Sequence, residues 1–456
     1  MPRNQAFMNN SVIKLKRGYD INLLGKAEKT FLSIEQPKLF ALKPGDIHGI
    51  APIPKLHVKE GDEIKAGQPL YFDKPSPNVQ YCAPVSGEIV EVRRGAKRAI
   101  EAVVMLADST MDFYDHGRLS DQASREDIVQ YLLKSGAWVL MRQRPFNIVP
   151  DPTAVPRDIF ISCFDTAPLA PDYGMLMKGK ETAFQQGLRV LGKLTSGRVH
   201  LGLGPGSPEV FTRAEGVVKH SFEGPHPAGN VGVHIHHVAP INKSDVVWVL
   251  KPQDVAIIGR LVAEGIYDAQ RTIAVAGDEL KKTGYFQTRI GAAIKPLIEG
   301  NLKTDHVRMI SGNPLTGTRI AADGFMSLFD DQLTVIEEGD KPEFLGWLLP
   351  SYPRPSLSRT FLSYLFPNRE FHVNTNNHGE LRAYVMTGQY EEVLPMDLYP
   401  QHLIKSIMYR DFDEMEGLGI YEVVEEDLAL CEFVCTSKQP VQAILREGLD
   451  AMRVEG

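Results

Sequence analysis

A glycine-rich stretch, LGLGPGSP (201–208), has the residue types that could bind a phosphate. Glycine loops that follow a strand and precede a helix present backbone N–H groups to a pyrophosphate at the helix N-terminus. Here the spacing is G-x-G-x-G rather than G-x-G-x-x-G, and Pro205 lacks a backbone donor. Glu209 also brings a carboxylate to the place that the anion would occupy. The stretch therefore argues against a dinucleotide or flavin site.

Four histidines lie close together in the segment GPHPAGNVGVHIHH (224–237). We expect a strand here, which would put His234 and His236 on one face at a spacing that can bind zinc or copper. No cysteine and no clear third ligand lies nearby in the sequence. The alternative is that the histidines line a turn or contact a partner. We therefore predict no metal site.

The cysteine pair Cys431 and Cys435 could supply only part of an iron–sulfur site. A cubane cluster needs four thiolates, usually in a C-x2-C-x2-C-x3-C run. The positions three and six residues before Cys431 hold Leu428 and Glu425, so half of the ligand set is absent. We predict two buried free thiols in a segment that resembles a ferredoxin module without its cluster.

Lys74 lies in YFDKPSP (71–77), between the strings VKEGDEIKAGQPL (58–70) and APVSGEIVEV (83–92). These strings resemble the half-motif of biotinyl and lipoyl carrier domains, in which a lysine at a hairpin tip is modified. Lys74 lies farther from Ala83 than the carrier lysine lies from its Ala-Pro pair, and prolines flank it. We expect a carrier-like fold that serves only as structure.

The composition is typical of a folded protein with several domains. The chain has 456 residues, of which 43% are hydrophobic and 23% charged. At about 100–200 residues per domain, this length predicts three or four domains. The formal net charge of −7 argues against a general nucleic-acid binder, which needs a large basic surface. No window reaches the roughly 18 consecutive apolar residues of a membrane-spanning helix. The N-terminal stretch shows no secretory signal, and we expect a cytoplasmic protein.

The elements that must position these residues change in character along the chain. Residues 39–106 are short apolar runs separated by turn signals, which predicts an all-β module. Ser124 is expected to cap a helix over 125–133. Strand-like and helical patterns then alternate, which predicts a mostly parallel sheet covered by helices. The expected strands are 158–162, 198–203 and 245–250, and the expected helices are 182–194 and 253–263.

Strands return at 271–277 and 283–291, followed by a short helix over 292–298 and a last strand near 333–336. This order resembles a ligand-binding β-grasp module, and the remaining chain is helical and acidic toward its end. The fold class that we predict is multidomain α/β and β. Its parts are an N-terminal segment (1–38), a biotinyl/lipoyl-like barrel-sandwich domain (39–110), a Rossmann-like domain (111–265), a β-grasp domain (266–336) and a C-terminal domain, helical at its end (337–456).

This order of domains resembles the flavin-binding subunit of respiratory complex I and its bacterial relatives. Long strings over all the proposed domains are similar to the A subunit of the sodium-translocating NADH:quinone oxidoreductases. The strings are IKLKRGYDINLLG (13–25), APVSGEIVEVRRGAKRAI (83–100), GPHPAGNVGVHIHHVAPIN (224–242), SGNPLTGTRI (311–320), FLGWLLPSYPRPSLSRTFLSYLFP (344–367), HGELRAYVMTGQYEEVLPMDLYPQHLIK (378–405) and EEDLALCEFVC (425–435).

The resemblance implies a peripheral subunit on the cytoplasmic face of the bacterial inner membrane. The six-subunit complex of that family oxidises NADH, reduces ubiquinone or menaquinone and exports sodium ions. The resemblance further implies that FMN, FAD, riboflavin and iron–sulfur centres reside on other subunits. This chain would then bind no cofactor, carry no catalytic residue, and contact the B subunit in the membrane.

An aromatic segment interrupted by prolines has the composition of an interface loop. The resemblance makes its residues candidates for contacts with quinone or with a partner chain, although aromatic residues in such a segment are more often core. The candidates are Phe344, Trp347, Phe361, Tyr364 and Phe366.

Two other classes of protein remain open at this point. The first is a soluble NADH- or flavin-dependent oxidoreductase, which would bind its own cofactor. The second is a lipoyl or biotin carrier-like protein, which would carry a modification on Lys74. A scaffold without catalysis overlaps with the main interpretation.

Overall fold

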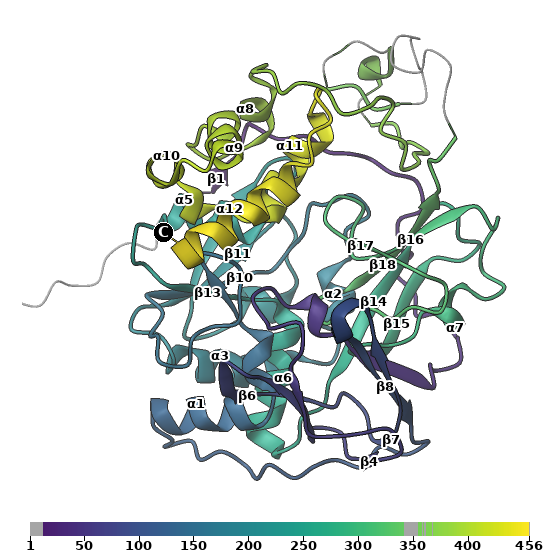
Figure 1. The fold of residues 1–456 in the computed structure, drawn as a ribbon, viewed down its shortest axis with the longest axis vertical. Helices are drawn as coiled ribbons and strands as arrows, with labels where there is room; N and C mark the ends of the chain where they lie inside the picture. Colours follow the sequence, from purple (N-terminus) through teal and green to yellow (C-terminus); the bar gives the residue numbers. More distant parts are fainter. Residues whose placement is uncertain (1–11, 342–353, 358, 360–361, 367, 456) are drawn as a thin grey trace, which may run out of the picture.

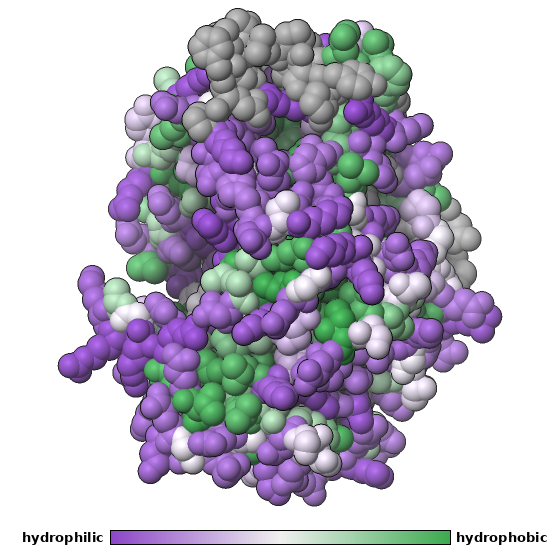
Figure 2. Space-filling model, turned by 90° about the vertical axis from the view of Figure 1, so that its right-hand side faces the viewer, coloured by the Kyte–Doolittle hydropathy of each residue, from purple (hydrophilic) through white to green (hydrophobic). Residues whose placement is uncertain are grey.

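The computed structural model describes residues 12–341, 354–357, 359, 362–366 and 368–455. Figure 1 shows a barrel of short strands at the bottom, an α/β layer beside it, a further sheet on the right and a group of helices at the top left. Figure 2 turns the molecule by 90° and shows a mostly hydrophilic face with small, separate hydrophobic patches. Within the described ranges, no helix is both long and apolar enough to cross a membrane.

The N-terminal barrel consists of two small sheets, with strand orders β2-β8-β7-β4 and β3-β5-β6. Along β7, Ile89 points into the barrel while Glu88 and Val90 point outward, which is the alternation of a half-buried strand. The all-β prediction for 39–106 is confirmed, and Lys74 lies exposed in the turn between β5 and β6. The strands are β2 (Leu39–Leu42), β3 (Lys55–Leu56), β4 (Glu63–Ile64), β5 (Pro69–Asp73), β6 (Ser76–Cys82), β7 (Gly87–Arg94) and β8 (Ile100–Ala107).

The α/β part has a six-stranded sheet of order β1-β12-β11-β10-β13-β9. All its pairs are parallel except β13 with β9, so the prediction of a mostly parallel sheet is confirmed. The helix after Ser124 is also confirmed, because the Ser124 side chain accepts from Asp127 N and Asp127 in turn accepts from Ser124 N. Its strands are β1 (Ile13–Lys14), β9 (Arg142–Arg144), β10 (Asp158–Ser162), β11 (Val199–Leu203), β12 (Val218–Glu223) and β13 (Val247–Leu250), and its helices are α1 (Arg125–Lys134), α2 (Tyr173–Leu176), α3 (Glu181–Gly192), α4 (Glu209–Thr212), α5 (Val231–Val238) and α6 (Pro252–Glu264).

The two edge strands, β1 and β9, were absent from the predicted elements. They contain two and three residues, too few to show a period of two in the sequence. Strand β1 pairs with β12, so the N-terminal segment is part of the α/β sheet. It then continues past two other parts of the fold, through bridges from Leu23 to Phe371 and from Phe31 to Tyr285.

The next sheet has the order β15-β14-β18-β16-β17, with β14 and β18 parallel at its centre and all other pairs antiparallel. The expected helix over 292–298 is shorter than predicted, because only Lys295–Ile298 is helical and Pro296 lies in its first turn. The elements are β14 (Gln270–Ala276), β15 (Gly284–Arg289), α7 (Lys295–Ile298), β16 (Val307–Ser311), β17 (Thr318–Ile320) and β18 (Gln332–Glu337).

The C-terminal helices pack on β1, β12 and α5 of the α/β part through one hydrophobic cluster. A buried ion pair adds to this contact: Arg144 on β9 binds Asp427 at 2.9 Å and Glu426 at 2.6 Å. Both carboxylates belong to α11, which holds it against the sheet edge. The helices are α8 (Gln389–Val393), α9 (Pro400–Tyr409), α10 (Phe412–Gly417), α11 (Glu425–Val434) and α12 (Val441–Glu455).

Helices α3 and α6 cross closely because each has a glycine at the contact. A Cβ on Gly187 would lie closer than 3.0 Å to the backbone of Val255, and one on Gly259 would meet the backbone of Ala183. Rigid backbone cannot yield as a flexible side chain would. The two glycines therefore set the spacing of the helices that cover the parallel sheet.

We predict that Gly259→Ala lowers the free energy of unfolding by about 1–3 kcal/mol, because the added methyl group forces the helices apart. Gly192→Ala is the matched control: it lies near the end of α3, where an added Cβ would have no other atom within 4 Å. The control is expected to stabilise by about 0.5–1 kcal/mol, the ordinary helix preference of alanine over glycine. Urea unfolding followed by circular dichroism measures both changes. Equal effects of the two substitutions would contradict this account of the crossing.

Candidate functional site

A cavity of about 580 Å³ opens at the carboxyl ends of β10 and β13. The chain leaves β10 toward β11 on one side, and later returns to β13 on the other side of β10. Adjacent parallel strands with connections that diverge in this way create a crevice at their carboxyl ends, where ligands of open α/β sheets bind. Ser162 at the end of β10 and Lys251 just after β13 line this crevice.

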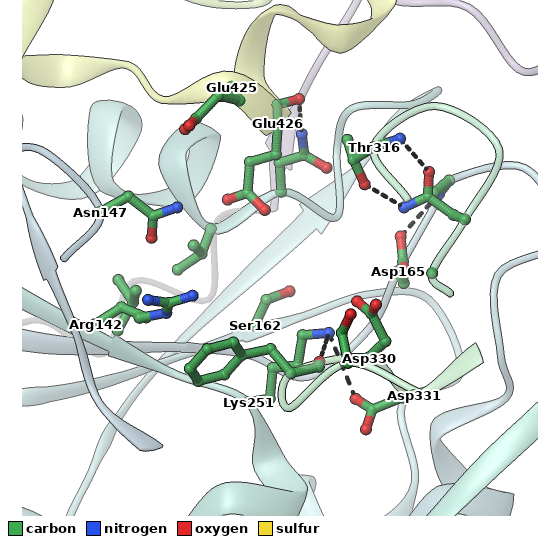
Figure 3. Close-up of a pocket in the computed structure, with 18 of the residues that line it drawn as sticks. Arg142, Asn147, Ser162, Asp165, Lys251, Thr316, Asp330, Asp331, Glu425 and Glu426 are labelled. Carbon is green, nitrogen blue, oxygen red and sulfur yellow. Dashed lines mark hydrogen bonds and ion pairs between the residues drawn. The ribbon is translucent and has the colours of Figure 1, made fainter. Parts of the chain in front are cut away.

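All four parts of the fold contribute to the cavity wall. The barrel supplies Asp46, the further sheet supplies Asp330 and Asp331, and α11 supplies Glu425 and Glu426. Figure 3 shows the two glutamates on one side of the cavity, with Lys251, Asp330 and Asp331 facing them from the other side. The shape of the cavity therefore depends on how the parts are held together.

The lining is acidic: it contains seven Asp or Glu residues and four Lys or Arg residues. Three of the four cations are already paired with carboxylates. Arg144 binds Glu426 and Asp427, Lys251 lies 3.7 Å from Asp331, and Arg446 lies 3.1 Å from Glu425. Cations outside the lining pair with three of the seven carboxylates: Lys43 lies 3.2 Å from Asp46, and Arg271 binds Asp254 and Asp331. The lining itself still contains more acidic than basic side chains.

Arg142 is the fourth cation, and it stacks on an aromatic ring instead. Its guanidinium carbon lies 3.6 Å from the ring centroid of Phe329, a cation–π geometry. One terminal nitrogen, Nη1, is buried and has no hydrogen-bond partner in the described part of the chain. Burial lowers the pKa of Arg142 to about 10, so the group stays charged at neutral pH.

Two aromatic rings pack against the first two glycines of the glycine-rich stretch, whereas a Cβ on Gly206 would meet no atom within 4 Å. A Cβ on Gly202 would lie closer than 3.0 Å to the His234 ring, and one on Gly204 would meet the Phe164 ring in the same way. The Ser207 hydroxyl accepts from Gly204 N at 3.0 Å and closes the turn. The glycines thus make room for the protein's own side chains. Because the Ser207 hydroxyl already accepts from Gly204 N and the cavity lining is acidic, this arrangement disfavours the phosphate group of a flavin or nicotinamide nucleotide.

The expected strand at the histidine cluster is wrong, because Val231–Val238 forms helix α5. Residues two apart on a helix point in different directions, so His234 and His236 do not share a face. His234 stacks on Phe222 with ring centroids 4.0 Å apart, whereas His236 binds Glu422 on the C-terminal part at 2.9 Å. The prediction failed because the helix is short and mostly apolar, so alternation of valine and histidine imitated a strand.

The cysteines Cys431 and Cys435 are both buried free thiols, as expected. Cys431 lies inside α11, with its Sγ 3.9 Å from the carbonyl oxygen of Tyr390, and burial raises the pKa of its thiol. Cys435 caps the end of α11 and accepts from Gln439 N at 3.4 Å. Both side chains belong to the hydrophobic cluster of the C-terminal helices.

Of the five aromatic candidates, Phe344, Trp347 and Phe361 lie outside the described residues. Tyr364 and Phe366 are about half exposed, at 45% and 49%. Leu362 and Leu365 beside them are exposed as well. Tyr364 and Phe366 are not among the residues that line the cavity.

Models of one protein family match most of the chain. They are the NqrA N-terminal barrel-sandwich hybrid domain at residues 13–108, the NqrA second alpha/beta domain at 123–267 and the NQRA C-terminal domain at 272–322. The first two descriptions agree with the barrel and the parallel sheet described above.

Curated relatives match over the full length, and each is the A subunit of a Na(+)-translocating NADH-quinone reductase. The relative from Yersinia pestis bv. Antiqua is 37% identical over 449 residues, which is 98% of this chain and 100% of the relative. The one from Alcanivorax borkumensis is 37% identical, with the same coverage. The one from Rhodopirellula baltica is 39% identical over 453 residues, 98% of this chain and 99% of the relative. The chain belongs to this NqrA family.

Solved structures give a weaker likeness. A chain of an NAD+-reducing NiFe-hydrogenase covers 75% of this chain and 67% of its own length, at 10% identity and a TM-score of 0.37. This likeness is too low to carry a structural argument about the NqrA family.

The sequence reasoning missed the cavity residues of this family member. Asp165, Asp331 and Glu425 belong to no recognisable motif and come from three parts of the fold. One signal was available: Ser162, Asp165 and Lys251 are polar residues at or just after the ends of two predicted parallel strands. Carboxyl ends of parallel strands meet at one edge of a sheet, which is where such side chains gather.

We predict that buried His234 makes the fold less stable in acid. Its Nε2 lies 2.8 Å from the carbonyl oxygen of Ala228, and burial lowers its pKa to about 3. The unfolded chain binds a proton below a pH of about 6.5, while the folded chain does not, so stability is full above that pH and falls as the pH drops toward 3.

Through His234, the free energy of unfolding of the parent should fall by about 2 kcal/mol between pH 7 and pH 5. The variant His234→Gln should lack this part of the loss. Urea unfolding at both pH values gives this difference. Exposed His402 on α9 offers the control, since His402→Gln should leave the pH dependence as it is. A variant at His234 with the same pH dependence as the parent would show that this histidine is not held neutral.

Proposed function

We propose that this chain is the peripheral NqrA component of a Na(+)-translocating NADH-quinone reductase, where it assists quinone reduction or assembly without carrying a redox cofactor. The observation that carries the proposal is the 37–39% identity to curated NqrA proteins over 98% of the chain. In this proposal the chain lies on the cytoplasmic face of the bacterial inner membrane and contacts the B subunit in the membrane. FMN, FAD, riboflavin and the iron–sulfur centres reside on other subunits of the six-subunit complex.

The site chemistry supports a role on the quinone side of the reaction. A flavin or nicotinamide nucleotide brings phosphate charge, which the acidic cavity and the filled glycine turn disfavour. A quinone is uncharged, and its carbonyl oxygens need only hydrogen-bond donors. The ring of Tyr364, which is 45% exposed and lies outside the cavity lining, is a candidate for contact with such a ligand.

Two parts of the proposed domain division, the β-grasp domain and the C-terminal domain, have support in the fold. Along the chain, residues 266–336 form a hairpin of β14 and β15, the short helix α7 and then further strands. In the sheet the strands have the order β15-β14-β18-β16, and β14 and β18 are parallel neighbours. This order favours a β-grasp module. The helical end with its two buried thiols favours a ferredoxin-like module that has no cluster.

Deleting the gene for this chain tests the proposal in membranes that keep the other subunits. NADH oxidation with a water-soluble artificial acceptor should persist, because the flavins that accept hydride are elsewhere. Quinone reduction should fall to background and return when the purified chain is added. Loss of the other subunits from the membrane would assign an assembly role. If NADH oxidation and quinone reduction were both lost while all other subunits stay in the membrane, the alternative would be favoured, a chain that itself oxidises NADH.

We further predict that Tyr364 contributes to quinone affinity. At a position that dominates binding, truncating an aromatic side chain weakens the binding free energy by more than about 1.4 kcal/mol. That corresponds to about a tenfold loss of affinity. Titration of the purified chain with a soluble quinone should therefore show saturable binding that Tyr364→Ala weakens. Tyr409→Ala serves as the control, because Tyr409 is 83% exposed on α9. No saturable binding to the parent chain would contradict a quinone site on this protein.

A further inference from the structure

Three acidic side chains gather at one edge of the β14–β18 sheet. Asp278 and Glu279 follow β14, and Glu337 is the last residue of β18. The two strands are parallel neighbours, so their carboxyl ends meet at the same edge. The backbone of Glu279 is fixed there, because its carbonyl oxygen accepts from Lys303 N at 2.9 Å.

A segment from the C-terminal part brings a histidine to the same edge. Phe371 N donates to Asn22 O at 2.8 Å, and Asn374 forms a bridge with Glu337. Gly339 N donates to the hydroxyl of Thr375 at 2.9 Å, which fixes the far end of the segment. His372 is thereby held between these anchors, over the acidic side chains.

The ligand atoms of Asp278, Glu279 and His372 all lie within 4.8 Å of one another. His372 Nδ1 contacts Asp278 Oδ2, and His372 Nε2 lies 3.2 Å from Glu337 Oε2. In metal sites a coordinating histidine commonly donates its other ring N–H to a carboxylate, which fixes the ring. Glu337 stands in the position of that carboxylate.

A second observation concerns the other carboxylate oxygen of Asp278. The Asp278 side chain is only 10% exposed, and its Oδ1 is buried without a hydrogen-bond partner among the described residues. In the same described ranges, no Lys or Arg side chain forms an ion pair with Asp278, Glu279 or Glu337. One imidazolium cannot neutralise three carboxylates. A buried, partly unsatisfied carboxylate in such a group calls for a cation.

We propose that Asp278, Glu279 and His372 Nδ1 bind a divalent transition-metal ion of the Zn²⁺ or Mn²⁺ type, with Glu337 orienting the histidine. One imidazole nitrogen and two carboxylates suit these ions, and water completes the coordination. The ion joins the segment around His372 to the sheet edge. It is structural, because its ligands lie outside the cavity described above.

The test uses the purified full-length chain, stripped with a chelator and titrated with Zn²⁺ and, separately, Mn²⁺ by calorimetry. We expect one site per chain that His372→Ala and Glu279→Gln abolish. Glu337→Gln should weaken it by about 10–100-fold, the usual effect of losing a histidine's supporting carboxylate. His306→Ala is the matched control, since His306 pairs with Asp340 at 2.9 Å near the same sheet. The control should bind as the parent does.

Thermal unfolding separates loss of the site from loss of the fold. The metal should raise the unfolding temperature of the parent and of His306→Ala, and leave that of His372→Ala unchanged. Co²⁺ in place of Zn²⁺ should give visible absorbance that the same substitution removes. Absence of binding, or equal binding by His372→Ala and His306→Ala, would overturn the proposal and leave His372 as an ion-pair partner of Asp278 and Glu337.

Discussion

The buried guanidinium of Arg271 is the contact on which the cavity depends. Arg271 lies on β14, is 2% exposed, and binds Asp254 in the first turn of α6 and Asp331 just before β18. Although burial opposes its charge, the two carboxylates raise the pKa of Arg271. Burial likewise opposes ionisation of Asp331, but Lys251 and Arg271 hold its pKa below the usual value. Breaking such a buried network on one side costs about 3–5 kcal/mol, because it leaves a charge without a partner.

This network fixes the α/β part against the neighbouring sheet, and two of its members also line the cavity. Gln253 adds to it by donating to Thr272 O at 2.8 Å and to Asp331 at 2.9 Å. Because the carboxylates that hold the parts together also line the cavity, the cavity is acidic. A lining with more acidic than basic side chains disfavours a phosphate group. The same ion pairs therefore account both for the contact between the two parts and for two of the acidic residues in the lining.

Elements with a strong sequence period were predictable, and those that depend on tertiary contacts were not. The strands over 158–162 and 245–250 and the capped helix after Ser124 carry their signal in local spacing, and the structure has them. Strands β1 and β9 are too short for a period, and form only because a sheet edge is there to pair with. Helix α5 was mistaken for a strand because its short run of alternating valine and histidine imitates one. The partners of its histidines, Phe222 and Glu422, lie on other elements of the fold, so local spacing does not show them.

The candidate site was less predictable than the fold. The spacing of the glycine-rich stretch argues against a dinucleotide site, but the rings that pack against it come from residues 164 and 234, which the spacing does not predict. The cavity carboxylates come from all four parts of the fold and follow no motif. Sequence resemblance identified the family, whereas the placement of charge around the cavity required the structure.

The most direct test is equilibrium titration of the purified full-length chain with FMN and with NADH, followed by fluorescence quenching of the ligand. The acidic cavity and the filled glycine turn predict no saturable binding of either nucleotide. Saturable one-to-one binding at micromolar concentration would contradict the account, because it would mean that this chain holds its own redox cofactor or oxidises NADH itself.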